Sequence, residues 1–435
     1  MDVDRGLRGE ILAMLGLDLD AATEGAPFLS EAVALAEQDT NSESRVRVLC
    51  LVAWGRTWAL GRVDSDLLER ALELAEGSPI STSFAATTYG SLLAMAYENE
   101  CARDLLSSVR ALGPGTDDER LAEALGQLGR VEWAAGNWAH AAELTEEAAQ
   151  LAGQLGAEHL EQEIIGMQAV VAASRGDVDA ARTHGQRSLR LQELTGHPGA
   201  HIHGLALLEL SLENYEAAHA LVLPALVRMA RSEVRFPTMK TPIAIEALAH
   251  LGRSIEASNR LARFEDEARG ADRAWALASV QHCRGLLAAA DDDLQEAEAL
   301  LAAAADRSRE LGLPFEHGRS LLALGTVRRR LQQKLAARET LEEARLVLDR
   351  LGARIWTARA EAELRRIGGR RNPAGSALSE TEAQIAALVS SGHTNSEVAV
   401  ALQISRKTVE WNLSKIYRKV GVRSRTELAA RSSGD

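Results

Sequence analysis

Cysteine is scarce in this chain, which has 3 cysteines in 435 residues. Cys50, Cys101 and Cys283 lie far apart, and none belongs to a CxxC pair. This spacing argues against a disulfide framework and against a zinc site built on neighbouring cysteines. A chain without disulfides suits a reducing compartment, so we expect a cytoplasmic protein.

Long apolar runs are missing too. The opening stretch MDVDRGLRGEILAML places acids among its few cations and contains no extended apolar segment. It therefore predicts neither a signal peptide nor a transmembrane helix. We expect no membrane partner.

Motifs for catalysis and nucleotide binding are also lacking. No GxxxxGKS or GxxxxGKT run is present to cradle phosphates, so we expect no ATP hydrolysis. No Ser/His/Asp order or paired carboxylates stand out. His197, His201 and His203 are the one candidate metal set, but no Cys or carboxylate completes it, which favours ordinary loop histidines. We expect a protein that is not an enzyme and needs no metal or cofactor.

Aromatic residues make up only 4% of the chain. Six of the tryptophans fall at helical spacing, for which core packing is the favoured interpretation and ligand stacking the alternative. They are Trp54, Trp58, Trp133, Trp138, Trp275 and Trp356.

The net charge of −13 is unevenly distributed. Residues 378–435 hold 8 Lys and Arg against 6 Asp and Glu, a balance of +2, which leaves −15 for the remainder. An acidic body suppresses indiscriminate binding to nucleic acid, so any DNA affinity should come from a small patch near the C-terminus.

Between about residue 85 and residue 350 the chain is rich in Ala, Leu, Glu and Arg, which favours helices throughout. A small residue recurs there at steps of 37 to 40 residues, each time after a turn-forming pair such as Gly136-Asn137. Stacked helix pairs at a constant period make a solenoid, and we predict seven or more pairs in an all-α protein. The recurring residues are Ala102, Ala141, Ala181, Ala218, Ala257, Ala297 and Ala337.

This pattern resembles the tetratricopeptide repeat, although the period is nearer 40 than 34. The first 80 or so residues fit it poorly, and we expect irregular helix pairs that cap the array. Pro237 and Pro242 in RFPTMKTP predict a longer loop. Gly, Pro, Arg and Ser then crowd the stretch RRIGGRRNPAGSA, so we predict a repeat domain over 1–366 and a linker over 367–377.

Residues 378–435 carry several helix-start signals. Ser379 with Glu382, Thr394 with Glu397, and Ser424 with Glu427 each match a capping box, in which the hydroxyl and the Glu satisfy backbone N–H groups. Gly392 marks the end of the first helix, and Ser405 is a candidate N-cap for the third. These signals predict a four-helix domain.

A short helix, a tight turn and a longer helix define the helix-turn-helix unit, whose longer helix lies in the major groove of DNA. At 100° per residue, one face of the third helix is apolar and is predicted to be buried; it consists of Val409, Leu413, Ile416 and Val420. The opposite face carries Lys407, Trp411, Ser414 and Arg418, flanked by Glu410 and Lys415. Cations for phosphates and polar tips for base edges are the groups that groove reading needs.

The segments TNSEVA, ISRKTVE and KIYRKVGVRSRTEL resemble the LuxR-type DNA-binding domain. The resemblance implies that Glu410, Trp411 and Ser414 face bases, that Thr408, Lys415 and Lys419 approach phosphates, and that the fourth helix pairs two copies. Asn412 departs from the histidine that the family often has there. The predicted DNA-binding set is Lys407, Thr408, Glu410, Trp411, Asn412, Ser414, Lys415, Arg418, Lys419, Arg423 and Arg425, and the predicted pairing set is Thr426, Leu428, Ala429 and Ala430.

The repeat region also resembles the C-terminal half of the large ATP-binding LuxR-family regulators, whose P-loop domain has no counterpart in these residues. The sequence therefore predicts a transcription regulator that binds duplex DNA as a homodimer. The resemblance implies an activator that contacts RNA polymerase, and the solenoid offers a surface for an effector or a protein. The alternative is an interaction scaffold whose helix-turn-helix does not read DNA specifically.

Overall fold

The computed structural model describes residues 5–18, 24–112, 117–195, 201–231, 236, 238–367, 380–402, 404–420, 422, 424, 425, 427 and 428. Within these residues every regular element is an α-helix, which confirms the all-α prediction. The chain divides into two compact units, Met1–Ile367 and Gly368–Asp435. Residues 368–377 of the predicted linker lie outside the described residues.

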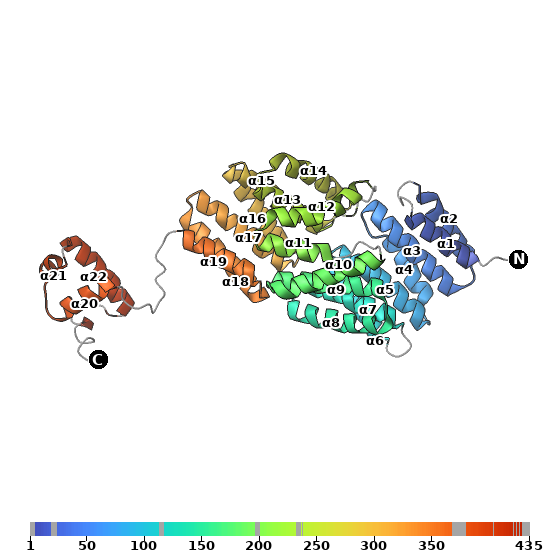
Figure 1. The fold of residues 1–435 in the computed structure, drawn as a ribbon, viewed down its shortest axis with the longest axis horizontal. Coiled ribbons are helices and arrows are strands. Elements are labelled where there is room, and N and C mark those ends of the chain that lie inside the picture. The colour runs from blue at the N-terminus through green and yellow to red at the C-terminus, as the bar shows by residue number, and fades with distance from the viewer. Residues whose placement is uncertain are drawn as a thin grey trace. The chain divides into compact units, whose positions relative to one another are not determined.

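The described residues of the first unit, the body, form nineteen helices (Figure 1). They are α1 (Arg5–Asp18), α2 (Ala26–Gln38), α3 (Ser42–Leu60), α4 (Ser65–Ala75), α5 (Pro79–Met95), α6 (Asn99–Ala111), α7 (Asp118–Ala134), α8 (Trp138–Leu155), α9 (Glu158–Arg175), α10 (Val178–Thr195), α11 (His201–Ser211), α12 (Tyr215–Arg231), α13 (Lys240–His250), α14 (Ser254–Gly270), α15 (Ala274–Ala290), α16 (Leu294–Glu310), α17 (Pro314–Arg330), α18 (Lys334–Leu351) and α19 (Arg354–Arg366).

Helices α1 to α18 pack as nine consecutive pairs, and α19 packs against α18 as an unpaired last helix. Each pair stacks on the next, which is the helical-repeat solenoid that the period predicts. Of the predicted long loop RFPTMKTP, residues 235 and 237 lie outside the described residues, whereas Pro242 lies in the first turn of α13 and so does not belong to a loop. No helix in the described part of the chain combines the length and apolarity needed to cross a membrane.

The recurring alanines set the register of the pairs from α6 onward. Each is the fourth residue of the second helix in its pair, and all seven are fully buried. Five residues before each alanine the backbone adopts a positive φ, because the chain must reverse within a short turn. The positive-φ residues are Tyr97, Gly136, Gly176, Glu213, Gly252, Asp292 and Gln332.

Small residues on the first helix complete this close packing. A Cβ added to Gly129 of α7 would lie 2.5 Å from Cγ2 of Thr145 in α8, and one added to Gly325 of α17 would lie 2.5 Å from Cγ of Leu341 in α18. Such distances are far below van der Waals contact, so the paired helices come closer together than a Cβ at either position would allow.

The first two pairs keep the register position but not the turn of the later pairs. Leu29 in α2 and Leu68 in α4 are each the fourth residue of their helix, and both are buried. Neither leucine follows a positive-φ residue by five positions, so the array continues to the N-terminal pairs with leucine at the register position and a different turn.

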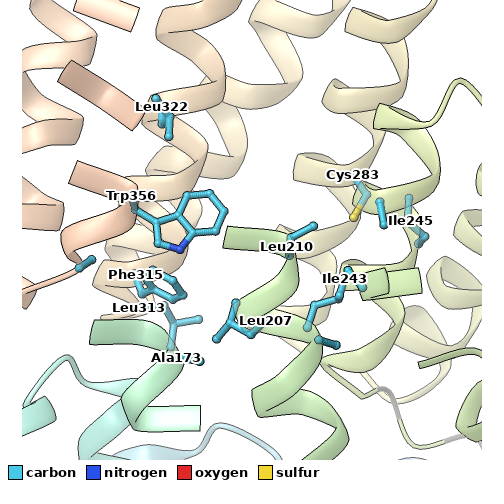
Figure 2. Close-up of a cluster of buried hydrophobic side chains, with 14 of the residues drawn as sticks. Ala173, Leu207, Leu210, Ile243, Ile245, Cys283, Leu313, Phe315, Leu322 and Trp356 are labelled. Carbon is cyan, nitrogen blue, oxygen red and sulfur yellow. The ribbon is translucent and has the colours of Figure 1, made fainter. Parts of the chain in front are cut away.

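The body also makes contacts between segments distant in sequence. The Trp138 ring lies 5.3 Å from the Phe315 ring, which lies 5.9 Å from the Trp356 ring, so α8, α17 and α19 meet. Figure 2 shows Phe315 and Trp356 together, with Leu207 and Leu210 of α11 beside them. Four tryptophans are buried, as expected for core packing: Trp133, Trp138, Trp275 and Trp356.

Candidate nucleic-acid interface

The second unit, the head, contains α20 (Glu380–Ser390), α21 (Asn395–Ala401) and α22 (Arg406–Val420). Ile385 and Val389 of α20 are buried, and Gly392, the predicted end of that helix, has a φ of 98° just after it. A residue with a side chain is strained at this φ, so glycine allows the chain to turn sharply into α21. Ser379, the predicted cap of α20, lies outside the described residues.

The capping box at the start of α21 is present. The N–H of Glu397 donates to Oγ1 of Thr394 at 3.3 Å, and the N–H of Thr394 donates to Oε2 of Glu397 at 2.7 Å. These hydrogen bonds to the carboxylate hold the pKa of Glu397 below its usual range. The box fixes the direction in which α21 leaves the Gly392 turn.

The turn between α21 and α22 is equally well defined. The N–H of Ile404 donates to the carbonyl of Ala399 at 3.0 Å. Oγ of Ser405 accepts from the N–H of Thr408 at 3.1 Å, which confirms Ser405 as the N-cap of α22. Oγ1 of Thr408 lies 2.8 Å from the same hydroxyl, so its side chain takes part in the cap.

One face of α22 packs against α20 and α21. Val409 and Ile416 are fully buried and Leu413 is 6% exposed, in a core shared with Ile385 and Val398. The predicted apolar stripe is therefore confirmed at three positions, and the side chain of Val420 lies outside the described residues. The buried stripe directs the opposite face of α22 away from the head's core.

The described part of that opposite face is charged and exposed. Lys407 is exposed, and Nε of Arg406 donates to Oε1 of Glu410 at 3.0 Å. Asn412 donates from Nδ2 to the carbonyl of Thr408 at 2.9 Å, so in this structure its amide serves the helix. Arg406 is absent from the sequence-predicted set, although its place in the first turn of the longer helix is visible in the sequence.

The structure does not describe the remaining predicted contacts. Trp411, Ser414, Lys415, Arg418 and Lys419 belong to α22, but their side chains lie outside the described residues. Arg423, Thr426, Ala429 and Ala430 lie outside them entirely.

Two residues of the predicted sets take part in the fold of the head. Arg425 donates from Nη2 to the carbonyls of Val389 and His393, and from Nη1 to Oδ1 of Asn395 at 3.4 Å. Its guanidinium therefore holds the turn before α21, while its contact with phosphate stays a prediction. Leu428 is 2% exposed within the head's core, so its side chain is not available to pair two copies.

Of the three histidines considered for metal binding, only His203 has a described side chain. His203 is buried with its ring edge-on to Trp133 at 5.7 Å, and burial lowers the pKa of its imidazole to about 3. His197 and the side chain of His201 lie outside the described residues. Among the described residues no group of three His, Cys, Asp or Glu is placed to hold a metal ion.

Comparison with known families identifies the head. Residues 376–432 match the family described as bacterial regulatory proteins, luxR family. The C-terminal unit is therefore a LuxR-family helix-turn-helix domain, which follows a helical-repeat body. No curated protein sequence matches the chain.

The body resembles solved helical-repeat structures at low identity. A Rap protein crystallised with competence and sporulation factor matches at 13% identity over 75% of this chain and 99% of that one, with a TM-score of 0.50. Aspartyl phosphate phosphatase F from Bacillus subtilis matches at 13% identity over 80% and 94%, with a TM-score of 0.47. The TPR domain of P58(IPK) matches at 16% identity over 83% and 99%, with a TM-score of 0.23. The body is a tetratricopeptide-like solenoid.

Proposed function

We propose that this protein is a sequence-specific, DNA-binding transcription regulator in which α22 enters the major groove. The first turn of α22 carries the neighbouring cations Arg406 and Lys407 and no acid. Cations at a helix N-terminus oppose the helix dipole, which costs roughly 0.3–1 kcal/mol each. A DNA phosphate at that end would reverse the cost, because it meets both the cations and the positive end of the helix dipole.

The roles proposed for the other residues follow if α22 binds in the major groove in this way. Trp411, Ser414 and Glu410 would face bases, while Lys407, Lys415, Arg418 and Lys419 would neutralise phosphates. Two heads would pair through the fourth helix with Thr426, Ala429 and Ala430 at the contact, and each would read one half-site. We further propose that the protein activates transcription and contacts RNA polymerase.

Selection of bound fragments from random duplex DNA tests the proposal. The full chain should return a partly palindromic motif, and Trp411→Ala or Ser414→Ala should change which sequence is selected. Lys407→Ala should weaken binding to all sequences alike and flatten the salt slope by about one. The control is Lys334→Ala, which removes an exposed cation of the body and should change neither the selected motif nor the salt slope. If Trp411→Ala and Ser414→Ala both return the wild-type motif, the base-reading face of α22 is assigned wrongly.

We also propose that the body controls the head through a tether at residues 368–377. Two heads held in one dimer meet the second half-site at an effective concentration that reaches the millimolar range. A fragment beginning at Arg370 should therefore bind the same motif more weakly if the body pairs two chains, or more tightly if the body inhibits. Equal affinity and stoichiometry for the fragment and the full chain would assign the body to another role.

The alternative is an interaction scaffold whose body binds protein partners. A concave groove of about 1340 Å³ lies along α13, α15, α17 and α19. The body also shares its fold with a protein that was crystallised with a bound factor. Failure of the random-DNA selection to return any motif, together with an intact fold, would favour this function.

A further inference from the structure

The first helix of the body, α1, buries its small residues and exposes its large apolar ones. Its buried face packs against α2 and α3 and consists of Gly6, Gly9, Ala13 and Gly16. A Cβ added to Gly16 would lie 2.6 Å from Cδ2 of Leu29 in α2, which is far below van der Waals contact. This face of α1 therefore lies as close to its neighbours as glycine allows.

The opposite face of α1 carries four large apolar side chains, and we call these four residues the α1 face. Leu7, Ile11, Met14 and Leu15 are 52%, 49%, 58% and 43% exposed. At 100° per residue they fall within about 100° of one another. No other helix in the described part of the chain has more than two exposed large apolar residues. Scattered apolar residues are normal at a surface, whereas a contiguous group of them marks an interaction site.

The α1 face lies at the end of the array, where a further helix pair would stack. Interior helices are covered on both sides, as α5 is by α3 and α7. Helix α1 packs against α2 and α3, and Figure 1 shows this pair at the N-terminal end of the body. The surface that stacks one pair on the next therefore continues onto the α1 face.

The other end of the array has the opposite character. Helix α19 exposes Arg354, Glu361, Arg365 and Arg366, and none of its described side chains is both large, apolar and exposed. A polar outer face is what the end of a soluble solenoid requires. The α1 face does not meet this requirement unless a partner covers it.

The α1 face is complementary to a second copy of itself. Leu7, Ile11 and Leu15 are four residues apart, so they form an i±4 ridge of the kind through which packed helices interdigitate. The order Leu, Ile, Leu is the same in both directions along the helix. A two-fold axis beside Ile11 therefore places Leu7 of one copy against Leu15 of the other.

The charges of α1 favour an antiparallel arrangement of the two copies. Its first turn carries Arg5 and Arg8 and no acid, and its last turn carries no basic residue. In an antiparallel pair these cations lie near the C-terminal end of the other α1, where the helix dipole is negative. A parallel pair would bring the arginines of one copy against those of the other.

We infer that two copies of this protein associate through the α1 face, as an antiparallel two-fold pair of α1 helices centred on Ile11. Four side chains bury less than the roughly 800 Å² per partner of a standard interface, so the dimer is reversible and forms as the concentration rises. This contact joins two bodies, whereas the pairing proposed through the fourth helix joins two heads. It does not depend on DNA binding.

Opposite charges at the two-fold axis test the contact by sedimentation equilibrium of the full chain. Ile11→Glu should weaken the dimer at least about tenfold, because two carboxylates then face each other, and Ile11→Lys should do the same. An equimolar mixture of the two variants should recover the dimer, because glutamate then faces lysine. Ile255→Glu is the matched control, since Ile255 is an isolated residue of α14 that is 82% exposed.

A disulfide cross-link separates this contact from any pairing of the heads. Cys101 is the exposed cysteine, while Cys50 and Cys283 are buried, so Cys101→Ser provides the background. In that background Ile11→Cys should give a covalent dimer on mild oxidation, because the two new thiols face each other across the axis. Ile255→Cys should give no more covalent dimer than the background.

Three results would overturn the inference: a wild-type chain that stays monomeric up to its highest soluble concentration, no recovery of the dimer on mixing the two charged variants, or no more cross-linking through Ile11→Cys than through Ile255→Cys. No DNA is present in these measurements, so their failure would leave the proposed function of the head untouched. Failure of the random-DNA selection would likewise leave the α1 contact untouched.

Discussion

Arg273, just before α15, donates from Nη1 to Oε1 of Glu98 at 2.8 Å, and so joins two turns that are far apart in the chain. Its Nε also donates to the carbonyl of Gly61 at 3.3 Å, and its guanidinium lies 5.5 Å from the Phe236 ring centroid. The Arg273 side chain is only 6% exposed. One buried guanidinium therefore connects the N-terminal pairs to the middle of the array.

We expect Arg273→Leu to lower the free energy of unfolding by about 1–3 kcal/mol, because it removes charge-assisted hydrogen bonds and leaves the Gly61 carbonyl unpaired. Arg70→Leu is the matched control, since the exposed pair of Arg70 with Glu37 should contribute less than about 1 kcal/mol. Urea denaturation of both variants measures the difference. Equal losses would show that Arg273 does not connect these parts of the body.

Close packing at the helix pairs predicts a sharp contrast between two glycines. Gly325→Ala should destabilise the body by about 1–3 kcal/mol, because the new Cβ would overlap Leu341. Gly153 in α8 has no neighbour within 4 Å of the corresponding Cβ, so Gly153→Ala should leave stability unchanged or raise it by up to about 1 kcal/mol. Thermal unfolding of both variants tests this, and a destabilised Gly153→Ala protein would contradict it.

His203 predicts a loss of stability in mild acid. Its folded-state pKa of about 3 lies below the ordinary value of 6.5, so the unfolded chain binds the proton more readily. The stabilisation is complete above pH 6.5 and is lost as the pH falls towards 3. Between pH 7 and pH 5 this histidine should account for about 2 kcal/mol.

The variant His203→Phe keeps a ring against Trp133 and removes the titration. Its free energy of unfolding should fall less between pH 7 and pH 5 than that of the wild type, and the difference isolates His203 from the other histidines. Parallel pH profiles would show that His203 is protonated as easily in the folded body as in the unfolded chain.

The capping box of the head offers a test of the helix-turn-helix itself. Thr394→Ala removes the acceptor for the Glu397 N–H and should cost about 1 kcal/mol, while Thr394→Ser should restore most of it. Ser396→Ala, at an exposed position in α21, is the control. Denaturation followed by far-UV circular dichroism on the head measures all three, and a stable Thr394→Ala protein would contradict the role of the cap.

Features set by local chemistry could be predicted from the sequence. The alanine period predicted the helix pairs, because a small residue such as Ala218 is needed where the backbones of two paired helices approach each other. The Thr394 and Ser405 caps satisfy N–H groups only two or three residues away, so their spacing suffices to reveal them. The N-terminal pairs fit the period poorly because Leu29 and Leu68 fill the position that alanine occupies in the later pairs.

Features set by distant contacts could not be predicted. Arg425 looks like one more cation of a basic tail, and only the fold brings it to the carbonyl of His393. The sequence alone does not show whether Leu428 packs inside the head or pairs two copies, because that depends on how the helices of the head pack.

The constant five-residue interval between each positive-φ turn residue and its buried alanine limits where the body tolerates changes in length. An extra residue inside that interval would rotate the second helix by about 100° and carry the alanine off its contact. Insertions and deletions should therefore be confined to the junctions between pairs. A fluorescent label or an affinity epitope should be inserted at such a junction, for example between α6 and α7, and never within a hairpin turn.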